Sequence, residues 1–246
     1  MNGKGHGMHS PFVYRFIRDV LNDRKPYPEY ATVEALRRRL LRDQSEVEIR
    51  EFGAGTSGRQ GNTRTVSSIA RRAAKSPRLA QLLFRIAKYY QPSNMLELGT
   101  SLGISGSYLQ LGQPDAELIT MEGMPGVAFR AGVNFAELGL RPRIIEGNFD
   151  DTLPGLLAVA GTLDLVFVDG NHRRKPTEQY FSMLLPHIGN DSIIIFDDIH
   201  WSPDMEAAWD AIRNHEAVRC SIDLFFFGIV LFRNEFREKQ HFMIRF

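Results

Sequence analysis

A glycine-containing run at residues 95–109, MLELGTSLGISGSYL, has the strongest chemical signal in this chain. In it Glu97 is followed by Gly99 and Gly103. Gly99 would let the chain turn out of a strand, and Gly103 has no Cβ to block a ligand. A helix that begins there would offer backbone N–H groups to an anion or a polar group. The pattern predicts a loop that binds a nucleotide-type cofactor.

Ser101 and Glu122 narrow the kind of cofactor. The dinucleotide fingerprint requires Gly-x-Gly-x-x-Gly, and Ser101 stands where its second glycine would be, so a pyrophosphate would be crowded. A strand expected at 117–121 ends just before Glu122, whose carboxylate could accept hydrogen bonds from both ribose hydroxyls of a nucleoside. A nucleoside cofactor without a pyrophosphate fits best, although the same Glu122 would also serve an NAD ribose.

Three aspartates follow two later strands. Asp169 comes after LVFV, and Asp197 and Asp198 come after SIIIF. Neighbouring parallel strands lie about 4.8 Å apart and bind ligands beyond their carboxyl ends, so these carboxylates could converge on Mg²⁺ or another divalent cation. His172 is a candidate general base because histidine exchanges a proton near neutral pH, and His200 is a weaker candidate for base or ligand. The alternative is that these side chains only cap turns or face solvent.

The spacing Glu97-x-Gly99-x-x-x-Gly103 resembles that of class I S-adenosylmethionine-dependent methyltransferases, and in particular the catechol-type O-methyltransferases. The resemblance extends over about residues 94–205 and includes GNFDDTLPGL at 147–156, where such enzymes line the adenine. It implies S-adenosylmethionine as the cofactor. The cofactor-binding residues it implies are Glu97, Gly99, Ser101, Gly103, Glu122, Asn148, Phe149 and Asp169.

The same resemblance implies the metal ligands and the base. Catechol-type enzymes hold their metal with an Asp after the fourth strand and an Asp-Asn pair after the fifth. Asp169, Asp197 and Asp198 stand at these positions, with Asp198 in place of the asparagine. The base of that family is a lysine three residues after the first Asp, where this chain has His172. The implied function is methyl transfer to a hydroxyl of a small molecule, assisted by a divalent cation.

The sequence leaves other functions open. A nicotinamide-dependent oxidoreductase could use a similar sheet, and a catalytically silent module could bind the cofactor and use its helical segment to contact a protein. Enzymes that methylate base amino groups carry Asn/Asp-Pro-Pro-Tyr/Phe after the fourth strand, so Asp-Gly-Asn-His at 169–172 makes a nucleic-acid partner unlikely. The excess of Lys and Arg over residues 31–94 leaves RNA ribose methylation open.

From residue 94 onward, apolar runs of strand length alternate with helical patterns, which is typical of parallel βαβ units. We expect strands at 94–98, 117–121, 142–146, 163–168 and 192–197, a helix at 204–215, and an antiparallel pair at 217–224 and 226–233. The predicted fold class is α/β, a doubly wound, mostly parallel seven-stranded sheet of the Rossmann-like methyltransferase type with an N-terminal helical addition.

The N-terminal part shows helical spacing at 11–22, at 31–43 and over about 65–90, where Pro77 could break the helix. We therefore predict two domains, an N-terminal helical segment with a lid loop at 1–93 and a cofactor-binding methyltransferase domain at 94–246. The second glycine motif, EFGAGTSG at 51–58, follows a charged stretch unlike a buried parallel strand. We expect it to be a loop or lid rather than the cofactor site.

The composition is that of a globular protein with 246 residues, 43% hydrophobic and 24% charged, and a net charge of +1. Cys220 has no second cysteine to pair with, and the first ten residues are polar, so we expect a cytoplasmic location. No apolar stretch approaches the roughly 20 residues of a membrane span, and we expect no membrane role. The helix at 11–22 could be a dimer contact, which leaves a homodimer open.

Overall fold

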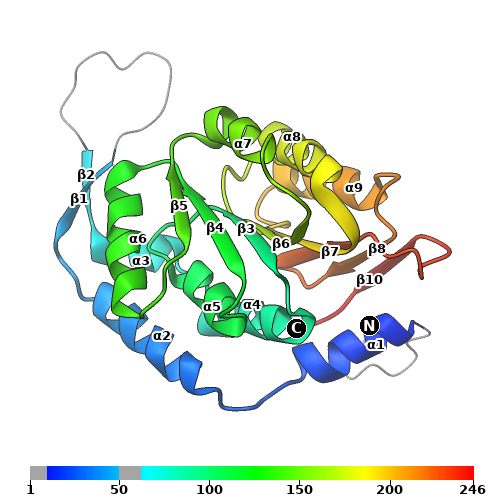
Figure 1. Cartoon of the computed structure of the whole chain (residues 1–246), viewed down its shortest axis with the longest axis horizontal. Coiled ribbons are helices and arrows are strands. Elements are labelled where there is room, and N and C mark those ends of the chain that lie inside the picture. Colours follow the sequence, from blue (N-terminus) through cyan, green and yellow to red (C-terminus); the bar gives the residue numbers. More distant parts are fainter. Residues whose placement is uncertain (1–9, 50–61) are drawn as a thin grey trace. The chain divides into compact units, whose positions relative to one another are not determined.

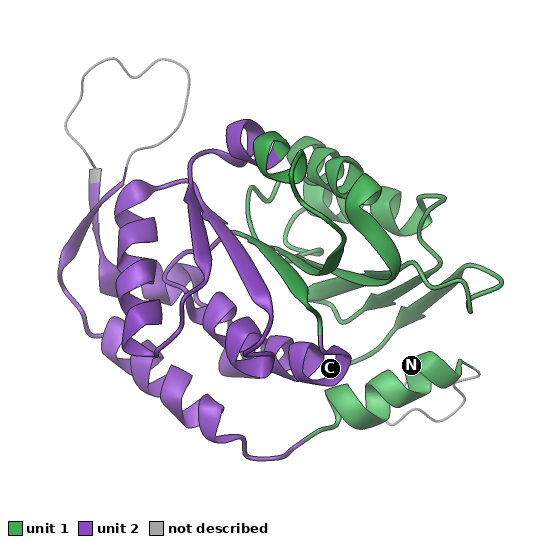
Figure 2. Ribbon diagram, viewed as in Figure 1, with its two compact units in different colours: residues 1–23, 92–98, 154–246 green, residues 24–91, 99–153 purple. Residues whose placement is uncertain are grey.

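The structure, a computed structural model, describes residues 10–49 and 62–246. The glycine motif at 51–58 and the lid expected there lie outside the described residues. The chain divides into two compact units, each built from segments that are distant in sequence (Figure 2). Unit 1 comprises residues 1–23, 92–98 and 154–246, and unit 2 comprises residues 24–91 and 99–153.

Unit 1 is built on six strands in the order β10-β8-β9-β7-β6-β3 (Figure 1). Strand β6 lies between β3 and β7 and is parallel to both. Strand β9 is antiparallel to β7 and to β8, and β10 is parallel to β8. The strands are β3 (Asn94–Leu98), β6 (Leu163–Val168), β7 (Ile188–Asp197), β8 (Cys220–Asp223), β9 (Phe227–Leu231) and β10 (Gln240–Met243).

The pairing of the parallel strands fixes which residues share one edge of the sheet. Leu98 pairs with Val168, and Val168 pairs with Phe196. Asp169 and Asp197 are each the next residue, so they stand at the same level on neighbouring strands. Because side chains at the same level of a parallel pair point to the same face, the two carboxylates are placed side by side.

The helices of unit 1 begin at recognisable caps. The Ser10 hydroxyl accepts a hydrogen bond from Val13 N at 3.4 Å, and the Ser202 hydroxyl accepts one from Met205 N at 3.2 Å. Each serine is followed by a proline, which suits the first helical position. The elements are α1 (Pro11–Phe16), continued by the π-helical turn η1 (Ile17–Leu21), α8 (Arg174–Leu184), the 3₁₀ turn η2 (Leu185–His187) and α9 (Pro203–Asn214).

Unit 2 contains the parallel strand pair β4–β5 and an antiparallel hairpin, β1–β2. Its core includes apolar residues from α2, β1, α3, α4 and α5. The elements are α2 (Pro28–Leu40), β1 (Glu46–Ile49), β2 (Asn62–Thr65), α3 (Val66–Ala73), α4 (Pro77–Tyr90), α5 (Ile104–Gly112), β4 (Glu117–Glu122), α6 (Pro125–Glu137) and β5 (Arg143–Glu146). Helix α7 (Phe149–Leu157) has residues in both units.

The predicted strands and the predicted helix break at Pro77 are confirmed, with two differences. The N-terminal part is not only helical, because the charged stretch before the glycine motif forms β1. Its Val47 and Ile49 are buried while Glu46 and Glu48 are exposed, so the charges lie on one face of a hairpin strand. The hairpin lies against α6, where a Cβ on Gly126 would come within 2.8 Å of Glu48 O.

The number of strands is the second difference. Eight strands are present besides the hairpin among the described residues, rather than the seven expected, because Gln240–Met243 forms β10 along β8. This segment is only four residues long and lies at the edge of its sheet, where few neighbours impose an apolar pattern.

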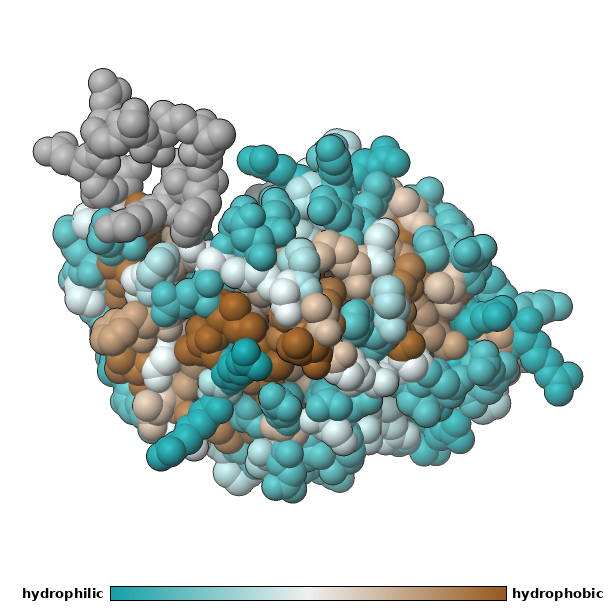
Figure 3. Space-filling view, turned by 45° about the horizontal axis from the view of Figure 1, so that its top comes forward, coloured by the Kyte–Doolittle hydropathy of each residue, from teal (hydrophilic) through white to brown (hydrophobic). Residues whose placement is uncertain are grey.

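Some large apolar side chains are exposed to solvent. Figure 3 shows hydrophobic surface reaching solvent among hydrophilic side chains on one face of the molecule. In unit 1 the exposed aromatic side chains include Trp201, Phe225 and Phe226, with exposed fractions of 74%, 63% and 49%. Within the described ranges, we find no helix with the length and apolar character needed to cross a bilayer.

Candidate cofactor and metal sites

The loop that follows β3 has an unusual backbone. Gly99, Ser101 and Gly103 all have positive φ angles, of 108°, 47° and 80°. Left-handed backbone is readily adopted by glycine and rarely by serine. A Cβ on Gly103 would also lie 2.9 Å from the ring of Phe135. The glycine at 103 is therefore required both by the backbone angle and by the close packing of α6 beneath the loop.

Hydrogen bonds from β4 hold this loop in place. Gly99 N and Thr100 N both donate to Met121 O at 3.0 Å. The Thr100 and Thr120 hydroxyls lie 2.5 Å apart, and both residues are fully buried. The loop is thus held by the strand that ends in Glu122.

Glu122 connects the loop to the start of α6. One carboxylate oxygen accepts from Ser101 N at 2.8 Å, and the other accepts from Met124 N at 3.0 Å. The residue is only 6% exposed. A carboxylate has about four acceptor positions, so such a group can hold two backbone N–H groups and bind ligand hydroxyls as well. The predicted contact of Glu122 with a ribose stays a prediction.

Helix α5 begins directly after the loop, with Gly103 as its N-cap residue and no side-chain capping bond. The first N–H groups of a helix have no partner within the helix, and they favour an anionic or polar ligand. The sequence prediction of a tight turn followed by a helix N-terminus is confirmed here.

Asn148 and Phe149 lie after β5. Gly147 N donates to Glu122 O at 2.9 Å, which brings this segment to the end of β4. The Asn148 side-chain oxygen accepts from Asp150 N at 3.3 Å, so it helps to cap α7. Phe149 is the first residue of that helix and is half-buried. Their predicted contacts with an adenine stay a prediction.

Unit 1 contains the other predicted site residues. Glu97 lies within β3, has no exposed surface and pairs in register with Phe167 of β6. Asp169 follows β6, and its backbone N donates to Leu98 O at 2.8 Å. Asp197 ends β7 and is 1% exposed. Glu97 and Asp197 are therefore both buried acidic residues within strands of the sheet.

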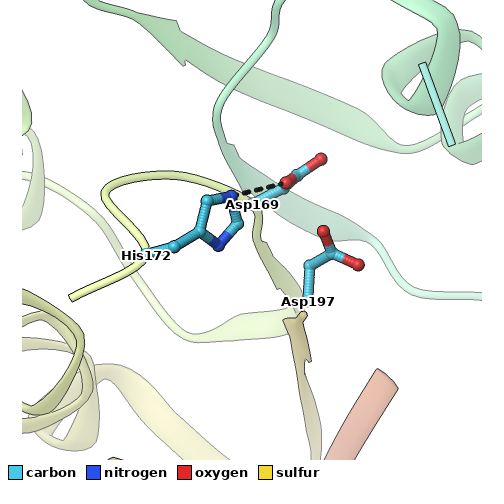
Figure 4. A group of neighbouring side chains, drawn as sticks. All are labelled: Asp169, His172 and Asp197. Atoms are coloured by element: carbon cyan, nitrogen blue, oxygen red, sulfur yellow. Dashed lines mark ion pairs between the residues drawn. The ribbon is translucent and has the colours of Figure 1, made fainter. Parts of the chain in front are cut away.

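Asp169, His172 and Asp197 converge (Figure 4). Each contributes one potential ligand atom, and these three atoms lie within 4.8 Å of one another. His172 Nε2 is 3.6 Å from Asp169 Oδ1, and the side chains of these two residues are 32% and 13% exposed. Carboxylate oxygens and an imidazole nitrogen are donors that divalent cations accept in proteins, so the set fits a cation.

Asp198 is not part of this group. Its φ angle is 52°, and its carbonyl oxygen accepts from Trp201 N at 2.9 Å, so the chain turns sharply where β7 ends. The group of possible metal ligands contains Asp169, His172 and Asp197 but not Asp198. Among the described residues, the structure brings together two of the three predicted metal ligands and the predicted base.

His200 lies in a different cluster. Its Nε2 is 2.9 Å from Asp223 Oδ2, and its Nδ1 is 3.2 Å from Glu206 Oε1. Burial alone would lower the pKa of His200, but the hydrogen bonds and charges of Asp223 and Glu206 outweigh it and raise that pKa above its ordinary value. Trp209 Nε1 also donates to Asp223 Oδ2, at 3.2 Å. With both ring nitrogens engaged, His200 has a structural role here.

Sequence reasoning missed the residues that support the two sites. The contact between the Thr100 and Thr120 hydroxyls could not be predicted, because the two residues are twenty positions apart and no local sequence pattern links them. Asn171 Nδ2 donates to the hydroxyl of the buried Tyr180 at 3.0 Å, and the φ of Asn171 is 55°. The Gly-Asn pair at 170–171 is a turn signal that could have indicated this bend.

Parts of the chain are similar to known methyltransferases. Residues 96–199 match the model of a methyltransferase domain. The chain is 32% identical over 128 residues to the catechol O-methyltransferase of Niastella koreensis, which covers 50% of this chain and 57% of that protein. It is 32% identical over 107 residues to a putative O-methyltransferase of Mycobacterium sp. (strain JLS), with coverage of 42% and 48%. The chain thus spans about half the length of the curated relatives it matches.

Solved structures show the same fold. The O-methyltransferase TomG from Streptomyces achromogenes, in complex with S-adenosylmethionine (SAM), is 23% identical with a TM-score of 0.57, covering 65% of this chain and 82% of that chain. The O-methyltransferase from Bacillus cereus, in complex with S-adenosylhomocysteine (SAH), is 17% identical with a TM-score of 0.60, covering 89% and 97%. The predicted fold class, a mixed sheet of mainly parallel strands flanked by helices, is confirmed.

Proposed function

We propose that residues 96–199, which match the model of a methyltransferase domain, form a class I SAM-dependent methyltransferase domain, and that this chain transfers a methyl group from SAM to a hydroxyl of a small molecule. In the reaction the hydroxyl oxygen attacks the sulfonium methyl. The O–C bond forms as the C–S bond breaks, SAH leaves, and the hydroxyl proton passes to a base. Positioning supplies much of the acceleration of such a displacement.

Glu122 is the observation that carries the proposal. Its buried carboxylate holds the Ser101 and Met124 backbone N–H groups at 2.8 and 3.0 Å, and this joins the glycine loop to the end of β4, where the ribose is proposed to bind. Gly103 and the start of α5 provide N–H groups for the amino-acid part of the cofactor. Asn148 and Phe149 are proposed to contact the adenine.

A divalent cation is the second part of the proposal. The buried Asp197 and the partly buried Asp169 would hold it, because two carboxylates at the same level of neighbouring strands give adjacent oxygen donors. When bound, a divalent cation lowers the pKa of a coordinated hydroxyl and orients its oxygen. Asp198, predicted as a further ligand, lies outside the group that Asp169, His172 and Asp197 form.

His172 is the catalytic residue of the proposal. Its ring nitrogen lies 3.6 Å from Asp169 Oδ1, so the imidazole is close to a carboxylate that would hold the cation. Two roles would help the transfer: taking the hydroxyl proton directly, or holding the cation that acidifies it. The two roles give different results when His172 is substituted.

The acceptor we propose is a small hydroxylated molecule, and the location we propose is the cytoplasm. Cys220, the single cysteine, is a buried free thiol, and free thiols persist in reducing compartments. The acceptor proposal is supported by the catechol O-methyltransferase relative and by the cation-binding set in unit 1.

Calorimetric titration and a methyl-transfer assay test this function. We expect the chain to bind SAM and SAH but not NADH, and to convert labelled SAM to SAH with a panel of catechols and other hydroxylated acceptors. A chelator should remove the transfer, and added Mg²⁺ or Mn²⁺ should restore it. Binding of NADH in place of SAM would favour an oxidoreductase, and SAH binding without turnover of any acceptor would favour a silent module. Either result would overturn the proposal.

A further inference from the structure

We infer that His172 Nε2 is a ligand of the cation, together with Asp169 and Asp197, and that the site therefore selects a transition-series divalent cation such as Mn²⁺ over Mg²⁺. The inference rests on the proposed function and assigns His172 the second of its two roles. It also assigns the third ligand position to the histidine rather than to Asp198.

The spacing of the ligand atoms is the first argument. Ligands bound about 2.1 Å from a cation lie about 3 Å apart when adjacent and about 4 Å apart when opposite. The 3.6 Å between His172 Nε2 and Asp169 Oδ1 falls between these values, and all three ligand atoms lie within 4.8 Å of one another. The three donors can therefore surround one cation with only small side-chain movements.

The same 3.6 Å separation argues against a base held by Asp169. An aspartate that orients a catalytic imidazole does so through a hydrogen bond, and N–H···O bonds have lengths of 2.7–3.2 Å. The His172–Asp169 contact is longer than this range. The separation instead suits two groups that share a cation placed between them.

The loop that carries His172 is held by its own contacts. Asn171, in left-handed backbone, donates to the buried Tyr180 hydroxyl at 3.0 Å, and the Thr177 hydroxyl donates to Arg173 O at 2.8 Å. These bonds fix the residues on both sides of His172. Groups that orient a ligand in this way commonly matter for metal affinity.

Donor chemistry then decides which cation is preferred. Two carboxylates and one neutral imidazole balance the charge of a divalent cation. Mg²⁺ favours oxygen donors and keeps several waters, whereas an imidazole nitrogen suits transition-series cations, whose affinity for such donors rises from Mn²⁺ onward. With Nε2 bound to a cation, His172 could not take the acceptor hydroxyl proton at that atom, and water would be the acceptor of this proton.

Pulsed EPR of the full chain loaded with Mn²⁺ tests the inference directly. We expect electron spin-echo modulation from a directly bound ¹⁴N, which changes to the ¹⁵N pattern when histidine is ¹⁵N-labelled. Because the chain has seven histidines, variants are needed to assign the signal to one of them. We expect the signal to vanish in His172→Gln and to persist in the matched control His187→Gln. Absence of nitrogen modulation in Mn²⁺-loaded wild type, its persistence in His172→Gln, or failure of the chain to bind Mn²⁺ would each overturn the inference.

Cation affinities give a second readout. We expect His172→Gln to weaken Mn²⁺ binding at least 10-fold and Mg²⁺ binding less than about 3-fold. His172→Asp, which offers an oxygen donor, should shift the preference toward Mg²⁺. Equal loss of both cations in His172→Gln would contradict the predicted selectivity. Thermal unfolding checks that each variant folds, and the labelled wild type tests the inference without any substitution.

The two proposals fail in different ways. Methyl transfer and SAH binding without a nitrogen signal would refute His172 as a ligand and leave the proposed function standing. A nitrogen signal lost in His172→Gln, in a chain that transfers no methyl group, would refute the proposed function and leave the cation site standing.

Discussion

Replacing Glu122 by glutamine should weaken both the fold and cofactor binding. The carboxylate accepts one backbone N–H on each oxygen, from Ser101 and from Met124. An amide has one oxygen and one NH₂ group, so one of these N–H groups would face a donor. A buried N–H without an acceptor costs about 1–3 kcal/mol. For a chain of this size, that loss lowers the melting temperature by roughly 2–12 °C.

Glu122→Gln should also weaken cofactor binding, in addition to its effect on stability. A hydrogen bond from a ribose hydroxyl to a charged acceptor contributes about 1.5–3 kcal/mol, so SAH binding should weaken roughly 10- to 150-fold. Isothermal titration with SAH and thermal unfolding measure the two effects. Glu117→Gln is the matched control, because Glu117 is an exposed acid on the same strand, β4. If Glu122→Gln bound SAH as tightly as wild type, Glu122 would not be the ribose ligand and the reasoning would be refuted.

Two further predictions concern packing and pH. Gly103→Ala should destabilise the chain, because left-handed backbone costs a residue with a Cβ about 1–2 kcal/mol and the new Cβ would lie 2.9 Å from the Phe135 ring. A lowered melting temperature would show this loss. Adding Phe135→Leu should remove the clash with the ring but not the cost of the left-handed backbone. The raised pKa of His200 predicts that its pairing with Asp223 and Glu206 stabilises the fold fully below the ordinary histidine pKa of about 6.5, and that this contribution is lost as pH rises through the folded-state pKa. Urea unfolding from pH 6 to 9 should therefore show the stability gap between wild type and His200→Gln narrowing as pH rises, whereas a constant or widening gap would contradict the pairing.

Most of the fold could be predicted from the sequence because each element carries a local pattern. The strands at 94–98 and 163–168 are continuous apolar runs, and Pro77 marks the start of α4. The β1 strand could not be predicted in the same way. Its exposed Glu46 and Glu48 alternate with only two apolar residues that face the core, and the stretch before it is charged. This alternation indicates a strand only when the partner strand is known.

The candidate site was predictable in part for a similar reason. Asp169 and Asp197 follow apolar strands, so parallel pairing alone places them together. The positions of His172 and Asp198 depend on turns, and turn geometry is set by contacts that the local sequence does not show. Asn171 bends toward Tyr180, and Asp198 takes a left-handed backbone. Resemblance to a family suggested the acids, and only the structure showed which neighbour joins them.

The discontinuity of unit 1 has a consequence for how the chain is synthesised and how it should be truncated. Phe12 of α1 packs edge-to-face on Phe236, with ring centroids 5.6 Å apart, so residues near opposite ends of the chain belong to one unit. On the ribosome, unit 2 has all its residues once position 153 has emerged, whereas unit 1 must wait for β10. A fragment that begins at residue 94 would lose α1 and expose Phe236, and we expect it to aggregate where the full chain does not.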